Sequence, residues 1–119
     1  MIRLRRLLSR FILGERNPLF DSELKRLRSL PGAHTAIAKE EFFQSLRHLA
    51  QRKPQTEDEL AILEAELFQL SERVGASDYV DDIPHEFWHF VADADIRFKD
   101  PSYGENQIRK ILEWIEKAG

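Results

Sequence analysis

The chain has 119 residues, of which 42% are hydrophobic and 33% charged, with five glycines, five prolines and no cysteine. This length predicts one domain, and the missing cysteine excludes disulfides, thiolate zinc sites and cysteine nucleophiles. No run of about 18 apolar residues predicts a membrane span, and the first residues lack the cleavage site of a secretory signal, so we expect a cytoplasmic protein.

The net charge of −3 is unevenly distributed along the chain. Residues 1–53 carry 12 basic and 5 acidic groups, whereas residues 57–105 carry 3 basic and 14 acidic groups. Two interpretations follow. Either the two parts attract each other inside one domain, or the acidic part faces a basic partner.

Residues 1–13 are predicted to form a short amphipathic helix, with apolar residues at helical spacing and arginines on another side. Such a helix either docks its leucines on the core or lies on a membrane surface or partner as a peripheral basic arm. Nucleic acid is disfavoured as a partner, because the other basic residues of 1–53 are shared among several predicted helices.

Two further helices are predicted before residue 54. Asn17 followed by Pro18 is a start signal for a helix that reaches Ser29. After Pro31-Gly32, a third helix is expected to open at His34 or Thr35 and to end before Pro54. Its buried stripe is predicted to include Ala38, Phe42, Leu46 and Leu49, or Phe43 and Ala50.

The segment 57–74 predicts the central helix of the fold. Thr56 and Glu59 have the spacing of a capping box, in which the hydroxyl accepts from the Glu59 N–H and the carboxylate returns to the Thr56 N–H. Gly75 is placed to cap the other end. The apolar residues between them are spaced three and four apart, as in a helix seam: Leu60, Leu63, Leu67, Leu70 and Val74.

The segment 76–82 is predicted to be an acidic loop, followed by one continuous helix over 83–99 with Asp82 or Ile83 as its cap. A last helix follows the cap-then-proline signal Asp100-Pro101 and turns Ile108, Ile111, Leu112 and Ile115 inward. No stretch alternates with period two. The chain is therefore predicted to be all-α, a compact single-domain bundle of five to six helices.

The string His85-Glu86-x-x-His89 resembles the zinc-protease (zincin) signature. By that resemblance His85 and His89 would be zinc ligands and Glu86 the general base for a zinc-bound water. Asp95 has the overall spacing of the third ligand in the extended form of the motif. That form uses a glycine where this chain has Ala92, and in a continuous helix Asp95 would face away from the histidines.

A second interpretation needs no metal. In a continuous helix His85, His89, Asp93 and Arg97 lie at intervals of four and form a stripe of alternating charge that faces water or a partner. The apolar arc of the same helix, with Trp88 at its edge, would face the core. No cofactor is expected under this interpretation, which we favour over zinc.

The preferred hypothesis is a non-catalytic protein-binding module, and one version is an acidic immunity-type inhibitor that covers a basic toxin or nuclease. This version rests on size and charge alone. Aromatic side chains beside a charged loop are common anchors of interfaces. The residues predicted to bind the partner are Asp78, Tyr79, Asp81, Asp82, Trp88, Asp93 and Asp95. The alternative is a zinc-dependent hydrolase that uses the His85-Glu86-x-x-His89 motif.

Overall fold

Helix α4 (Glu57–Gly75) is the element against which most other helices pack. The computed structural model describes residues 18–30 and 36–118, which contain six α-helices, a short 3-10 helix and no strand. The other elements are α2 (Pro18–Ser29), α3 (Lys39–Ala50), η2 (Val80–Asp82), α5 (His85–Ala92), α6 (Ala94–Lys99) and α7 (Pro101–Ala118). The predicted all-α class is confirmed, and these helices form one globule. The predicted helix over 1–13 lies outside the described residues.

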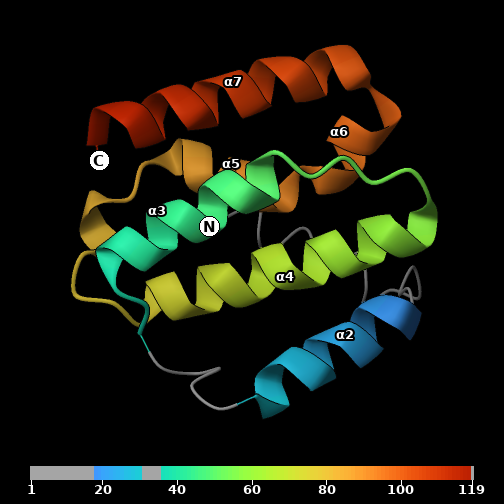
Figure 1. The fold of residues 1–119 in the computed structure, drawn as a ribbon, viewed down its shortest axis with the longest axis horizontal. Helices are drawn as coiled ribbons and strands as arrows, with labels where there is room; N and C mark the ends of the chain where they lie inside the picture. Colours follow the sequence, from blue (N-terminus) through green and yellow to red (C-terminus); the bar gives the residue numbers. More distant parts are fainter. Residues whose placement is uncertain (1–17, 31–35, 119) are drawn as a thin grey trace.

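Helix α4 is buried on two sides because it carries two apolar faces. Its predicted seam is confirmed: all five residues are at most 7% exposed, and they join the main core with α3, α5 and α7. The other face holds Ala61, Ala65 and Phe68, which pack against Phe20 of α2 in a second, smaller core. Figure 1 shows α4 between α2 on one side and α3, α5 and α7 on the other. Each large apolar side chain buried there contributes roughly 1.5–3 kcal/mol.

The N-terminus of α4 is held by Thr56, as predicted. The Thr56 hydroxyl accepts from the Glu59 N–H at 3.1 Å. The return bond differs from the capping box, because the hydroxyl also donates to the Glu59 carboxylate at 3.3 Å. At the other end α4 stops at Gly75, and the cap residue Ala76 stays in the right-handed region, so no left-handed glycine cap is used.

Replacing Thr56 with alanine is expected to lower the free energy of unfolding by about 1 kcal/mol, because the Glu59 N–H loses its acceptor. Urea unfolding followed by circular dichroism would measure the change. Thr56→Ser is the matched control, since it keeps the hydroxyl. Equal losses in the serine and alanine variants would show that the methyl group, and not the cap, carries the effect.

The proline start signals are confirmed more closely than the other helix starts. Helices α2 and α7 begin at Pro18 and Pro101, and Asp100 Oδ1 accepts from the Tyr103 N–H at 3.2 Å. The third helix is confirmed, with Phe42, Leu46 and Leu49 of its predicted stripe buried. Its predicted start and the burial of Ala38 are wrong, because residues 36–38 are not helical and α3 begins at Lys39 after an extended, exposed Ala38. No side chain caps α3, which explains why no sequence signal marks its start.

The predicted continuous helix over 83–99 is also wrong. Helix α5 begins at His85 behind Pro84, with no side-chain cap from Asp82, and it ends at Ala92. Asp93 has φ −100° and ψ 16°, and α6 starts at the next residue. The Phe90 carbonyl, which would accept from the Ala94 N–H in a continuous helix, instead accepts from Arg97 Nη1 at 2.5 Å. The guanidinium therefore satisfies the acceptor that the break sets free.

Helix α7 closes the bundle over α5 and α6 (Figure 1). Ile111 and Ile115 are buried, and Ile108 and Leu112 pack at the edge of the same core, as predicted. Gly104 marks a close approach of α7 to α6, because a Cβ at this position would lie 3.2 Å from both the Cβ and the carbonyl oxygen of Arg97. Within the described residues, no helix has the length and apolar character needed to cross a bilayer.

Candidate functional site

The His85-Glu86-x-x-His89 residues lie on α5, in the first two turns of the helix. His85 and Glu86 are exposed and His89 is half-buried. Glu86 and His89 line a small cavity of about 210 Å³ with residues of α7, among them Tyr103 and Lys110. The described residues contain no group of three His, Cys, Asp or Glu side chains arranged to hold a metal. Asp95, the proposed third ligand, lies beyond the break on α6.

Asp93 and Arg97 do not form the exposed stripe that a continuous helix predicts. Asp93 is 1% exposed, and its Oδ2 accepts from the Tyr103 hydroxyl at 2.8 Å and from Gln107 Nε2 at 3.2 Å. Gln107 also accepts from Arg97 Nη1 at 2.7 Å through its Oε1. The break at Asp93 is therefore tied to α7 by a buried polar network, and Asp93 does not face outward.

Arg97 is the cation of this network. Its guanidinium lies 3.8 Å from the centre of the Phe90 ring. Burial lowers the pKa of Arg97 to about 10, and Asp93 opposes that shift electrostatically. The side chain is therefore protonated at neutral pH, and a positive charge is held inside the protein next to a carboxylate.

The predicted partner-binding residues separate into an exposed group and a buried group. Asp78, Asp81 and Asp82 are exposed, and Tyr79 is half-buried beside them. Trp88 is 9% exposed and packs edge-on against Phe87, with ring centres 4.9 Å apart. Asp95 is half-buried on α6, which Figure 1 shows at the opposite end of the bundle from the segment 76–82. Of the seven predicted partner-binding residues, four therefore lie together: Asp78, Tyr79, Asp81 and Asp82.

We name the exposed surface around Asp78, Asp81 and Asp82 the acidic end. It includes acids that the prediction missed, because they come from distant parts of the chain. The first turn of α3 brings Glu40 and Glu41, and the end of α7 brings Glu113 and Glu116. Trp114 packs on Phe43 at 5.4 Å and so holds the last turns of α7 beside α3. Figure 1 shows all three segments at one end of the molecule.

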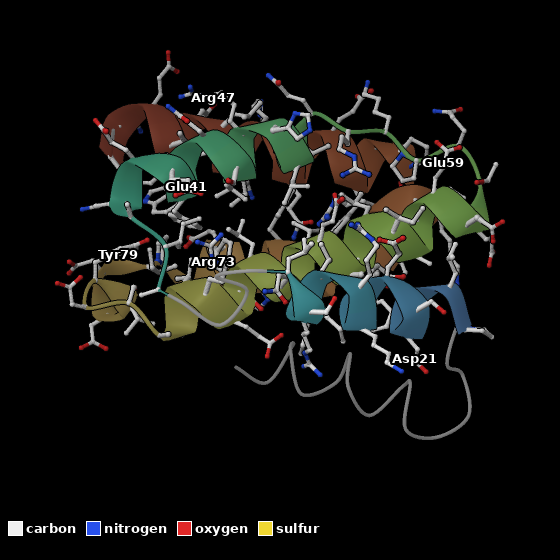
Figure 2. The ribbon with its side chains drawn as sticks, turned by 60° about the horizontal axis from the view of Figure 1, so that its bottom comes forward. Asp21, Glu41, Arg47, Glu59, Arg73 and Tyr79 are labelled. Atoms are coloured by element: carbon white, nitrogen blue, oxygen red, sulfur yellow. The ribbon has the colours of Figure 1, made fainter. Side chains whose placement is uncertain are left out.

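Tyr79 anchors the acidic end to the body of the protein. Its hydroxyl donates to the Ile37 carbonyl at 2.6 Å, and its ring lies 6.2 Å from that of Phe42. Burial is the main reason that the pKa of Tyr79 is raised, and Asp78 adds to the shift, so the phenol keeps its proton and its hydrogen bond. Figure 2 shows Tyr79 at the same end of the molecule as Arg73 and Glu41. Ile83, 8% exposed, fixes the far side of the segment in the core.

Ion pairs inside the fold neutralise part of the charge asymmetry along the chain. Arg28 of α2 pairs with Glu72 of α4 at 3.2 Å, and Arg52 pairs with Glu66. Arg73 lies 3.9 Å from Glu41. Attraction between the two parts therefore accounts for Glu66 and Glu72 of α4. It does not account for Asp78, Asp81 and Asp82, since none of these forms an ion pair with a cation in the described ranges 18–30 and 36–118.

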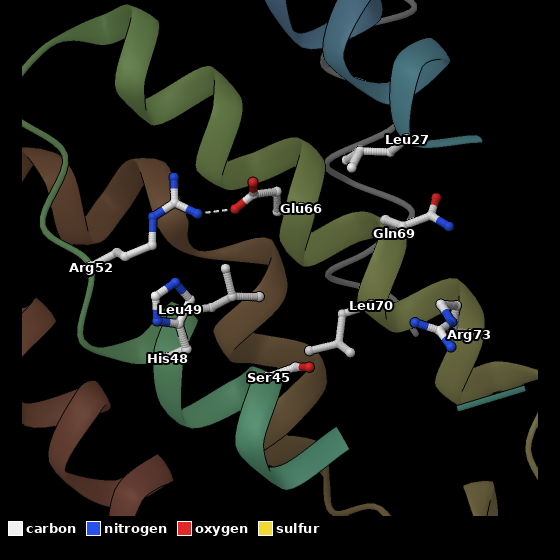
Figure 3. Close-up of a pocket in the computed structure, with 9 residues that line it drawn as sticks. All are labelled: Leu27, Ser45, His48, Leu49, Arg52, Glu66, Gln69, Leu70 and Arg73. Carbon is white, nitrogen blue, oxygen red and sulfur yellow. Dashed lines mark hydrogen bonds and ion pairs between the residues drawn. The ribbon is translucent and has the colours of Figure 1, made fainter. Parts of the chain in front are cut away.

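A groove of about 300 Å³ runs between α2, α3 and α4 (Figure 3). It contains Ser45 and His48, a nucleophile type and a base type on the same helix. Ser45 and His48 form no hydrogen bond with each other. The Arg52–Glu66 ion pair also lines the groove. A hydrolytic site needs the base within hydrogen-bond reach of the nucleophile and a third group to orient it. The described residues that line the groove do not form such an arrangement.

The chain matches no protein-family model, and no curated protein or solved structure matches it significantly.

Proposed function

We propose that this protein is a non-catalytic binding module whose acidic end receives a basic protein partner. The observation that carries the proposal is the exposure of Asp78, Asp81 and Asp82 without a described counter-ion, while Glu66 and Glu72 of α4 are paired within the fold. Unpaired charges that cluster on one surface create a field that steers an oppositely charged partner.

The local structure supports a surface that is organised before binding. Tyr79 and Ile83 fix the segment between α4 and α5 at two points, and Ser77 adds a bond from its hydroxyl to the Val74 carbonyl at 2.6 Å. A segment held in this way loses little conformational freedom on association. Tyr79 and Trp114 are both half-buried beside the acids. They provide the aromatic area that anchors many interfaces.

The more specific version of the proposal is an immunity-type inhibitor. A toxin that acts on nucleic acid presents a basic surface, and an acidic end of this kind complements it. Small size, a net charge of −3 and an exposed acidic end support this version. It remains an analogy of size and charge.

Charge reversal tests the proposal. In capture experiments from source-cell extract, the double variant Asp81→Lys/Asp82→Lys is expected to lose a partner that the wild type retains. For the purified partner we expect the association rate to fall about tenfold or more and to depend less on salt. The matched control is Glu57→Lys/Asp58→Lys, which reverses two adjacent exposed acids at the other end of α4.

The control is expected to retain the partner, and both variants must keep the helical circular dichroism of the wild type. Equal retention by the wild type and the Asp81/Asp82 variant would contradict the proposal. Loss of the partner from both double variants would indicate a response to net charge and not to the acidic end.

The zinc hydrolase is the weaker hypothesis. A catalytic zinc site uses three protein ligands. His85 and His89 supply two, Glu86 is assigned as the general base, and the described residues add no third ligand. A zinc-peptidase motif also sits inside its helix, whereas His85 is the first residue of α5.

A further inference from the structure

A second cavity lies at the end of the bundle opposite the acidic end, and it is larger than the groove of Figure 3. Its volume is about 440 Å³, within the range of small-molecule sites. The segment 49–55, α4, the α5–α6 break and the first turns of α7 all contribute to its wall. The apolar part of the lining consists of Leu49, Ala50, Pro54, Leu63, Phe90, Ala94, Phe98, Pro101 and Ile108.

The charged part of the lining is mostly basic. Arg52, Lys53 and Arg97 line the cavity, and Glu105 is the acid among the lining residues. Arg52 is engaged with Glu66, but Lys53 is exposed and forms no ion pair within the described part of the chain. The cavity thus combines an apolar wall with three basic groups, and one of these, Arg97, lies in the segment 57–105, where acids outnumber bases 14 to 3.

Arg97 supplies the feature that points to a ligand. Its Nη1 donates to the Phe90 carbonyl and to Gln107 Oε1, but its buried Nη2 donates to no acceptor among the described residues. Buried polar groups are nearly always hydrogen-bonded, and a protonated guanidinium without a partner on one nitrogen is costly. An anionic acceptor that entered the cavity would complete this hydrogen bonding.

We propose that this cavity binds a small organic anion with one carboxylate and an apolar body. The carboxylate would reach the free Nη2 of Arg97 near Lys53, and the apolar body would lie against Phe90, Phe98 and Ile108. One free nitrogen on one guanidinium suits a carboxylate better than a phosphate, which needs donors from several groups. This site lies apart from the acidic end and does not depend on the proposed protein partner.

The test uses the full chain labelled with 15N and two probes of equal length, decanoate and the neutral decanamide, both kept below aggregating concentrations. Decanoate is expected to bind at least tenfold more tightly. We expect its largest shifts at Arg97, including the guanidinium signals, and at residues 50–55. Equal affinities for the two probes, or shifts centred on the groove of Figure 3, would overturn the proposal.

Variants separate the contribution of the basic groups to the affinity from that of the apolar wall of the cavity. Lys53→Glu is expected to weaken decanoate binding several-fold and to leave decanamide unchanged, whereas Lys39→Glu, which reverses an exposed lysine of α3 outside the cavity, should change neither. Arg97→Met should remove the preference for the anion. If that variant does not fold, the comparison of Lys53→Glu with Lys39→Glu tests the proposal. Equal effects of these two substitutions on decanoate binding would overturn it.

Discussion

Replacing Asp93 with alanine is expected to lower the free energy of unfolding by about 3–5 kcal/mol, one of the two largest effects of a single substitution predicted for this chain. The carboxylate accepts from Tyr103 and Gln107 and is the main group that favours the charged form of Arg97. Its removal leaves a buried cation without the anion that most favours its charged form, and leaves the Tyr103 hydroxyl without this acceptor. The position is 1% exposed, so water cannot replace the lost bonds without a rearrangement.

Urea unfolding would measure this loss, with Asp81→Ala as the control. Asp81 is exposed and unpaired within the described ranges, so its replacement should stay within about 0.5 kcal/mol. The double variant Asp93→Ala/Arg97→Met should recover part of the stability, because it removes the unpaired cation as well. A loss below about 1 kcal/mol in Asp93→Ala would show that the network does not hold α5, α6 and α7 together.

Phe42→Ala is expected to cost about 3–5 kcal/mol for a different reason, the loss of a fully buried ring. Phe42 is 0% exposed and contacts the rings of Phe43, Tyr79, Phe87 and Trp114. The ring joins α3, the segment before η2, α5 and α7. Its removal leaves a cavity where four elements meet, which the surrounding helices can fill only by shifting together.

The same variant should also loosen the acidic end. Tyr79 loses one of its ring neighbours, so we expect faster amide exchange at Tyr79 and at the neighbouring residues of η2, in addition to the lower midpoint of urea unfolding. Leu30→Ala is the control, since Leu30 is 47% exposed and its loss should change stability by less than about 0.5 kcal/mol. A cost below about 1.5 kcal/mol for Phe42→Ala would contradict the assignment of this ring to the centre of the core.

The elements with strong local signals could be predicted from the sequence. The seam of α4 repeats over 15 residues, from Leu60 to Val74, and prolines mark the starts of α2 and α7. The start of α3 was missed because Ala38 offers no capping side chain. The break at Asp93 was missed because no glycine or proline is present. Contacts with Tyr103 and Gln107 stabilise that break, and these partners lie 10 and 14 residues further along the chain, on the separate helix α7.

The candidate site was predictable only where its residues are neighbours in sequence. Asp78, Tyr79, Asp81 and Asp82 lie in one short segment and were identified by their charge and by the aromatic residue among them. Glu40 and Glu116 join the acidic end through the packing of Trp114 on α3, which no local pattern predicts. The interpretation of Asp93 as a partner-facing residue depended on a continuous helix over 83–99. Because the helix is broken at Asp93 and its side chain is buried, that interpretation is wrong.

Site-specific photo-crosslinking in living cells tests the proposed role of the acidic end most directly. A photoreactive amino acid replaces Asp82, which is exposed at the acidic end, or Glu59, which is exposed near the start of α4. Figure 2 shows Glu59 and Tyr79 at opposite ends of the molecule. We predict a discrete adduct with a basic protein from position 82 and none from position 59. The absence of an adduct at position 82, or the same adducts from both positions, would contradict the proposed function.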